Sequence, residues 1–313
     1  MECNADYLIS LIGTNPLPAF ITILKNADKN TKIKLVYTKP TRNNISSKKI
    51  AENLSKVVVE KIPKISVEFV ECDKSNTKKI QKCIKDVIDS IKKDAGYGGY
   101  ARKVILDYSS GTKVMSALFT ERFANLKEDI LAVTISYVDD DDKQIFEYSY
   151  KDKDKKFPIK EIVNRFDLSV EDITRIHGYS RSSKSQEEIL NGKVKYIKNP
   201  EFISSKNGLP INVDEVYILD GRLIMCFKSK YENKNKSEYK MELFKIKDIS
   251  DKLGGSKSEI IYQSDCNGET VMRLKKDIKS DYEYEMDERA SFINLNESFV
   301  EKIIEKFKIE GGN

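Results

Sequence analysis

The sequence predicts an α/β protein whose first half forms a doubly wound, mainly parallel sheet, followed by a second α/β domain. Two observations lead to this prediction. Short apolar runs alternate with helical patterns through the first half, and 313 residues are enough for two domains with cores of their own. Strands that alternate with helices form parallel βαβ units, and ligands of such sheets bind beyond the carboxyl ends of the strands.

The first half begins with an apolar run that predicts a buried strand ending in a turn. A helical pattern follows it, and the alternation continues to residue 138. The predicted strands are 7–13, 32–37, 66–70, 103–108 and 131–138, and the predicted helices are 18–26, 46–60, 76–93 and 112–124. We therefore look for a ligand site in the loops that lead from these strands into helices.

A charged stretch at residues 151–156, followed by Pro158, predicts the end of the first domain. Beyond it, Ser169 precedes Glu171 and Asp172, which is the pattern of a capped helix with acidic residues in its first turn. We expect a first domain over 1–150, a linker with a connector helix over 151–185 and a second domain over 186–313.

The second domain is predicted to contain a β-hairpin and two helices. Asp220 and Gly221 lie between two apolar runs, and an Asp-Gly pair suits a tight hairpin turn. The predicted hairpin strands are 215–219 and 222–227, and the predicted helices are 241–253 and 297–307.

Composition excludes several classes of protein. No apolar run approaches the ~18 residues that a membrane helix needs, and no basic region precedes the first apolar stretch, so we expect a cytoplasmic protein without a membrane partner. Five cysteines without a C-x-x-C pair and a single histidine argue against a disulfide framework and a zinc site, and we assign His177 no chemistry. A net charge of +5 is too small for a protein that coats duplex DNA, so an anion must be bound by a local, shaped site.

The most specific segment is the predicted strand 103–108 with the residues that follow it, Ser-Ser-Gly-Thr-Lys. A strand that breaks into small hydroxyl and glycine residues before a helix leaves backbone N–H groups free at the positive helix end. Such a loop is suited to bind phosphates. It lacks the G-x-x-x-x-G-K-[ST] spacing, so ATP hydrolysis is not implied. Local chemistry alone also allows a simple strand-to-helix turn capped by Ser109 or Ser110.

This segment resembles the nucleotide-binding motif of the CARF domain of type III CRISPR ancillary effectors. The family motif is Thr-Gly-Gly-Thr-Lys-x-Met, and here two serines replace its first Thr-Gly. The resemblance implies a Rossmann-like fold and a homodimer that binds a cyclic oligoadenylate, either cyclic tetra-adenylate or cyclic hexa-adenylate, across its two-fold axis. The ligand-binding residues implied position by position are Thr14, Asn15, Thr38, Ser109, Ser110, Gly111, Thr112 and Lys113.

The helix that ends near Gly178 resembles the connector of CARF proteins with a C-terminal PD-(D/E)xK nuclease domain, which implies a restriction-endonuclease-like α/β fold for residues 186–313. Nucleases of this class hold Mg²⁺ or Mn²⁺ between an Asp on one hairpin strand and the Glu of a Glu-x-Lys on the next. Asp214 matches the Asp and Lys228 the Lys, but Cys226 stands where the Glu should be. A thiol is a poor ligand for such a hard cation.

The resemblance therefore implies a sensor and effector of type III CRISPR antiviral defence with a nuclease-like domain whose catalytic set is incomplete. The first alternative is an active nuclease that cleaves DNA or RNA with Asp214 as metal ligand, Lys228, and a relocated acid such as Glu242. Mg²⁺ or Mn²⁺ is required only in that case. An alignment shifted by one residue would place Phe227 at the Glu position and restore no carboxylate. The second alternative is a nucleotide-sensing transcription regulator or interaction module, but the sequence lacks the basic recognition helix expected of the former.

Overall fold

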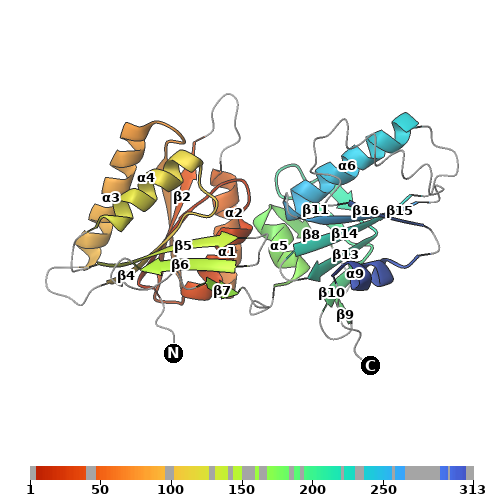
Figure 1. The fold of residues 1–313 in the computed structure, drawn as a ribbon, viewed down its shortest axis with the longest axis horizontal. Coiled ribbons are helices and arrows are strands. Elements are labelled where there is room, and N and C mark those ends of the chain that lie inside the picture. Colours follow the sequence, from red (N-terminus) through yellow and green to blue (C-terminus); the bar gives the residue numbers. More distant parts are fainter. Residues whose placement is uncertain are drawn as a thin grey trace. The chain divides into compact units, whose positions relative to one another are not determined.

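A computed structural model gives the fold (Figure 1). It describes residues 5–39, 47–95, 102–126, 131–139, 144–149, 159–161, 168–182, 187–190, 194–219, 222–229, 236–255, 258–264, 290–294 and 297–307. The chain divides into two compact units, Met1–Phe166 and Asp167–Asn313. No helix in these ranges is both long and apolar enough to cross a bilayer.

The first unit is built on a seven-stranded sheet with the order β3-β2-β1-β4-β5-β6-β7 (Figure 1). Its strands are β1 (Tyr7–Leu11), β2 (Lys32–Thr38), β3 (Ser66–Cys72), β4 (Arg102–Asp107), β5 (Leu131–Asp139), β6 (Gln144–Ser149) and β7 (Ile159–Glu161). The first five strands are parallel, and β6 and β7 are antiparallel additions. The α/β fold with a mainly parallel sheet is thus confirmed. Because β2 and β4 flank β1 on opposite sides, the strand order reverses between β1 and β4.

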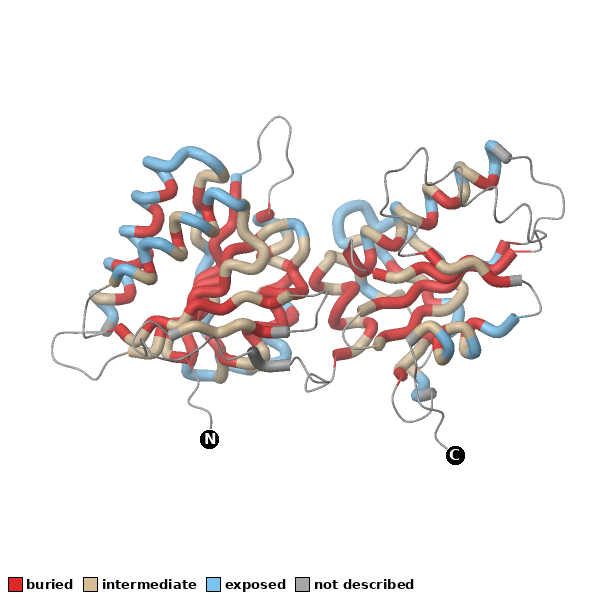
Figure 2. The backbone as a smooth tube through the Cα atoms, viewed as in Figure 1, coloured by how far each residue is buried: buried red, intermediate tan, exposed pale blue. Residues whose placement is uncertain are grey.

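Helices of the described residues cover this sheet (Figure 1). They are α1 (Leu17–Asn26), α2 (Lys48–Lys61), α3 (Thr77–Ala95) and α4 (Lys113–Ala124). In α3 the buried residues Ile80, Ile84, Val87, Ile88 and Ile91 recur every three or four positions, which gives the helix one apolar face. That face packs with residues of α4 and of the central strands in one core cluster, and Figure 2 shows the strands buried while the outer side of α3 is exposed.

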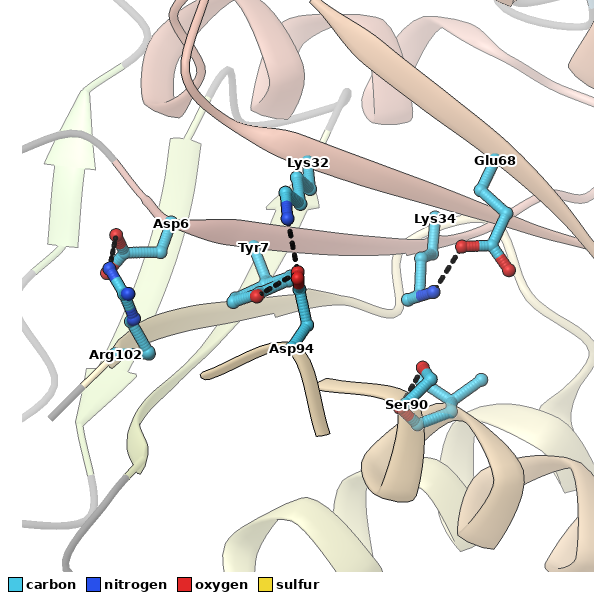
Figure 3. A network of polar contacts seen from close by, with 9 residues as sticks. Asp6, Tyr7, Lys32, Lys34, Glu68, Ser90, Asp94 and Arg102 are labelled. Carbon is cyan, nitrogen blue, oxygen red and sulfur yellow. Dashed lines mark hydrogen bonds and ion pairs between the residues drawn. The ribbon is translucent and has the colours of Figure 1, made fainter. Parts of the chain in front are cut away.

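A polar network closes the amino-terminal ends of the central strands (Figure 3). Asp94, near the end of α3, accepts hydrogen bonds from the Tyr7 hydroxyl and from Lys32 Nζ. Asp6 forms an ion pair with Arg102 at 3.4 Å. Burial and the Asp94 carboxylate raise the pKa of Tyr7 well above its usual range, so the phenol remains a donor. The network therefore ties the end of α3 to the starts of β1 and β2, at the end of the sheet opposite the strand-to-helix loops.

The second unit contains a six-stranded sheet with the order β16-β15-β14-β13-β10-β9 and a small sheet with the order β12-β11-β8. The strands are β8 (Tyr179–Arg181), β9 (Glu188–Leu190), β10 (Val194–Lys198), β11 (Glu201–Ser204), β12 (Pro210–Asn212), β13 (Glu215–Leu219), β14 (Arg222–Lys228), β15 (Glu259–Ser264) and β16 (Ala290–Asn294), and the helices are α5 (Val170–Ile176), α6 (Lys236–Gly254) and α9 (Phe299–Phe307). β13 and β14 form the predicted antiparallel pair, whose turn lies outside the described residues. α6 then connects β14 to the parallel strand β15.

The boundary between the units falls inside the segment predicted as a linker. β7 pairs with β6 and so extends the first sheet to residue 161. α5 contacts β8, β13 and α6, which places it in the second unit. Its start has the predicted cap: Ser169 Oγ accepts a hydrogen bond from the Asp172 amide at 3.0 Å, and the Asp172 carboxylate accepts one from the Ser169 amide at 2.9 Å. The charged stretch 151–156 lies outside the described residues.

Candidate functional site

The loops that follow β1 and β4 lie against each other at the point where the strand order reverses. Ser110 Oγ donates a hydrogen bond to the Asn15 carbonyl at 2.7 Å. A Cβ atom on Gly13 would lie 1.8 Å from the Ser110 carbonyl oxygen, so only glycine permits this approach. A Cβ atom on Gly111 would lie 2.8 Å from Ser116 Oγ. Two loops far apart in the sequence therefore form one continuous surface.

The helix α4 begins directly at this surface. Thr112 caps it, because its Oγ1 accepts a hydrogen bond from the Met115 amide at 3.3 Å and donates one to the Lys74 carbonyl at 2.9 Å. Lys113 and Val114 in the first turn are exposed, and N–H groups of a first helical turn have no partner within the helix. Lys113 forms no ion pair with any described residue. The helix start thus combines free N–H donors with a positive charge, which suits a phosphate.

The side chain of Ser109 is fixed by hydrogen bonds to groups inside the first unit. Its Oγ donates to Asp107 Oδ1 at 2.5 Å and accepts from the Val138 amide at 2.8 Å, and its own amide donates to Asp107 Oδ1 at 3.0 Å. Ser10 Oγ donates to Asp107 Oδ2 at 2.5 Å. Asp107 is fully buried, and burial raises its pKa although these hydrogen bonds act in the opposite direction. The hydroxyl proton of Ser109 is therefore committed inside the fold.

The other predicted ligand residues lie at the same end of the sheet. Thr14 is exposed on the loop after β1. Asn15 Oδ1 accepts a hydrogen bond from the Leu17 amide at 3.1 Å and so helps to start α1. Thr38 ends β2 and is buried, and its amide donates to Ser47 Oγ at 2.9 Å. The structure thus brings the loop residues after β1 and β4 together and places Thr38 at the end of the neighbouring strand; their role in ligand binding stays a prediction.

Two contributors to this site are not among the residues predicted from the sequence. One is Asp107, which looks like an ordinary strand-end residue until the sheet register places Ser10 beside it. The other is the turn after β3, where Asp73 Oδ1 accepts hydrogen bonds from the amides of Ser75 at 3.0 Å and Asn76 at 2.9 Å. These bonds lower the pKa of Asp73 and fix the turn. The Asp-x-Ser-Asn pattern is typical of such a turn, but it does not reveal the contact of Lys74 with Thr112.

In the second unit, the predicted catalytic residues meet at the open end of the β13–β14 hairpin. Asp214 Oδ2 accepts a hydrogen bond from the Lys228 amide at 2.7 Å, and Lys228 Nζ lies 3.7 Å from Glu215 Oε1. Cys226 is the direct cross-strand partner of Glu215 and is fully buried. Burial first, and then the charges of Glu215 and Asp214, raise the pKa of this thiol, so it stays protonated.

Glu242 lies elsewhere. Its Oε2 accepts a hydrogen bond from the Tyr262 hydroxyl at 2.7 Å, and Tyr262 pairs in register with Phe227. Side chains alternate between the two faces of a strand, so Lys228 is on the opposite face from Phe227. There its Nζ lies 5.1 Å from the centre of the Phe299 ring. The acid beside Lys228 is therefore Glu215, and Glu242 is on the other side of the sheet.

The described residues of this hairpin do not fit a divalent metal ion. Within the described part of the chain, no three His, Cys, Asp or Glu side chains are grouped so that they could hold one. The oxygens of Glu215 face Lys228 Nζ and the Tyr217 hydroxyl, and one oxygen of Asp214 is used by the Lys228 amide. The neutral Cys226 thiol offers no hard ligand.

Solved structures are similar to this chain over most of its length, and a family model matches the first unit in particular. The family described as the Card1 CARF domain matches residues 7–172. A search of curated proteins found no match to this chain.

Solved structures share the fold at low sequence identity. Can2 from Sulfobacillus thermosulfidooxidans, in complex with cyclic tetra-adenylate, is 13% identical, with a TM-score of 0.66 over 92% of this chain and 95% of that chain. Protein VC1899 from Vibrio cholerae is 12% identical, with a TM-score of 0.72 over 98% and 99% of the two chains. A type III CRISPR defence DNA nuclease activated by cyclic oligoadenylate is 11% identical, with a TM-score of 0.55 over 98% of this chain but 45% of that chain.

Proposed function

This chain belongs to the Card1 CARF domain family, and from that premise we propose that it is a cyclic oligoadenylate sensor and effector of type III CRISPR antiviral defence. The observation that carries the proposal is the surface made by the loops after β1 and β4, with the first turn of α4 and the exposed Lys113. Free N–H donors and an ammonium group are what a phosphodiester needs. The fold likeness to Can2, which was solved with cyclic tetra-adenylate, supports this ring as the first ligand, with cyclic hexa-adenylate as the alternative.

We propose that two copies of the chain bind one ring. A cyclic tetra-adenylate has identical halves related by a two-fold axis, and a two-fold homodimer presents the same surface twice. One copy has one loop surface with one Lys113, so each copy would bind one half of the ring. The oligomeric state with and without the ring, measured by analytical ultracentrifugation, tests this part of the proposal, and a monomer that binds a whole ring would contradict it.

Calorimetry with synthetic cyclic tetra- and hexa-adenylate tests the sensor function, with linear tetra-adenylate as the control ligand. The Lys113→Ala variant should bind at least about tenfold more weakly, because a charge-assisted hydrogen bond contributes roughly 1.5–3 kcal/mol. Lys29→Ala is the matched control, since Lys29 is exposed in the turn before β2, at the opposite end of the sheet. Failure to bind either ring would refute the proposal.

For the second unit we propose a restriction-endonuclease-like output domain, over residues 186–313, whose catalytic set is incomplete because Cys226 replaces the Glu. The β13–β14 hairpin followed by α6 and the parallel strand β15 supports this fold. The alternative is an active nuclease with a relocated acid. The position of Glu215 beside Lys228 favours Glu215 over Glu242 in that role.

The full chain can be incubated with labelled single- and double-stranded DNA and RNA, with Mg²⁺ or Mn²⁺ and the activating ring. This experiment distinguishes an incomplete catalytic set from an active nuclease. An incomplete site predicts no cleavage under any of these conditions. Cleavage that is lost in Asp214→Ala and Glu215→Ala but retained in Glu242→Ala would establish the alternative instead.

A further inference from the structure

Resting on the proposed function, we infer that Asp107 is a positioning residue for the ligand loop and that it takes up a proton when the polyanionic ring binds above it. Asp107 is the last residue of β4, and the loop that it supports begins at the next residue. Its side chain holds both Ser109 and Ser10, so it connects the loop to the neighbouring strand β1.

The groups that donate hydrogen bonds to the Asp107 carboxylate are all neutral. It is 0% exposed, and its hydrogen bonds come from Ser10 Oγ, Ser109 Oγ and the Ser109 amide. A buried charge without a cation is costly, and hydrogen bonds offset only part of that cost. Burial accordingly raises the pKa of Asp107, while the hydrogen bonds from Ser10 and Ser109 act in the opposite direction.

Charged side chains on the surrounding elements do not pair with Asp107. They are Asp6 before β1, Arg102 and Lys103 in β4, Lys25 in α1 with its partner Glu147 in β6, Asp139 in β5, and Lys113, Glu121 and Arg122 in α4. Lys103 precedes Asp107 by four strand residues, about 13 Å along the strand. Asp139 lies on the opposite face of β5 from Ser136, the register partner of Asp107. On the α1 face, Ser10 and Ser136 therefore flank Asp107, and the Lys25–Glu147 ion pair lies one strand further, because Glu147 is the register partner of Ser136.

If Asp107 is protonated, one of these hydroxyls is available to accept a hydrogen bond from it. Ser136 is the Cα partner of Asp107 in β5, it is fully buried, and its Oγ has no hydrogen-bond partner within the described structure. A protonated Asp107 could donate to Ser136 Oγ or to Ser109 Oγ. In the second case Ser109 becomes an acceptor toward Asp107, and its own hydroxyl proton is released for a phosphate oxygen. The proton comes from solvent, and no covalent bond between heavy atoms changes.

Phosphodiester charges on the loop shift this equilibrium. A negative charge near an ionised carboxylate disfavours the ionised form, more strongly in a low-dielectric interior than in water. Ring binding should therefore favour protonation of Asp107, and by linkage a lower pH should favour ring binding. If each subunit takes up one proton on binding, the affinity for the ring changes by up to tenfold per pH unit for each subunit.

The experiment is calorimetry of the full chain with cyclic tetra-adenylate between pH 6 and pH 9, in buffers of different ionisation enthalpy at each pH. We expect the binding heat to depend on the buffer, as proton uptake requires, and the affinity to fall as the pH rises. Asp107→Asn carries a neutral amide of the same size, so it should bind with a flat pH profile and without buffer dependence. Asp86→Asn, at an exposed carboxylate on α3, should keep the wild-type profile.

The outcomes are distinct. Wild-type binding with the same heat in every buffer and a flat pH profile would overturn the proton uptake and leave the proposed function standing. A variant Asp107→Asn that binds with the wild-type pH dependence would also overturn it. If this variant does not fold, the wild-type buffer comparison decides alone. Absence of binding at every pH would overturn the proposed function and this inference with it.

Discussion

Gly13 shows how a single hydrogen atom in place of a methyl group determines the shape of the candidate ligand surface. In Gly13→Ala the new Cβ would lie 1.8 Å from the Ser110 carbonyl oxygen, so the two loops must move apart. Overpacking of this kind costs about 1–3 kcal/mol, and we expect loss of ring binding as well. Urea unfolding and calorimetry measure the two effects. Lys29→Ala is the control, because Lys29 is exposed at the opposite end of the sheet, and wild-type ring affinity in Gly13→Ala would contradict the prediction.

The burial of His177 predicts that the stability of the second unit depends on pH. Its Nε2 is buried without a partner in the described structure, and burial lowers its pKa to about 4. Because the folded pKa lies below the unfolded value of 6.5, the unfolded state binds the proton first. The stability of this unit should therefore be fully present above pH 6.5 and fall by up to about 3 kcal/mol toward pH 4.

Urea midpoints of the full chain between pH 7 and pH 4 test this prediction. His177→Gln cannot take up the proton, so its midpoint should decrease less steeply with acidification than that of the wild type. Equal slopes for the two proteins would show that His177 does not titrate differently in the folded and unfolded states.

At the scale of elements, the start of α4 depends on Thr112. Replacing it by Ala removes the hydrogen bond to the Met115 amide and the one to the Lys74 carbonyl. Loss of an N-cap costs about 1 kcal/mol, and the turn after β3 also loses its contact with the loop. We expect Thr112→Ala to lower the urea midpoint, whereas Thr112→Ser keeps the hydroxyl and should stay near the wild type. Equal destabilisation by both variants would assign the effect to the lost methyl group instead.

The elements also show what the sequence can predict. The strands β1, β2 and β4 each contain a buried, mostly apolar run, and α3 has a clear helical period, so their positions follow from the sequence within a few residues. Short strands such as β9 and β12, of three residues each, have too few positions to show a period and were missed. α6 begins at Lys236 rather than near residue 241, because its first turn lacks an apolar pattern.

The candidate sites were predictable to the same extent. The motif identified the loop after β4, because glycine and hydroxyl residues between a strand and a helix have a local meaning. The contact of Ser109 with Asp107 and the placement of Glu215 and Glu242 on opposite faces depend on strand pairing, which a local pattern does not contain. Register between distant strands is therefore the information that sequence reasoning lacked.

At the scale of the whole molecule, each unit has its own core. One buried cluster joins β1 and β4 with α3 and α4, and a separate cluster joins β13 and β14 with α9. Neither cluster contains residues of the other unit. Two such cores can unfold in two steps, and a ligand that binds one of them stabilises that one by mass action.

Differential scanning calorimetry of the full chain with cyclic tetra-adenylate should therefore show two transitions, of which the ring raises only that of the first unit. At a free ring concentration of a hundred times Kd the stabilisation is about 2.7 kcal/mol. His177→Gln identifies the transitions, because it should alter only that of the second unit at pH 5, while Lys113→Ala should reduce the ligand-induced shift of the first. A single transition that the ring raises as a whole would mean that the two units unfold as one cooperative body.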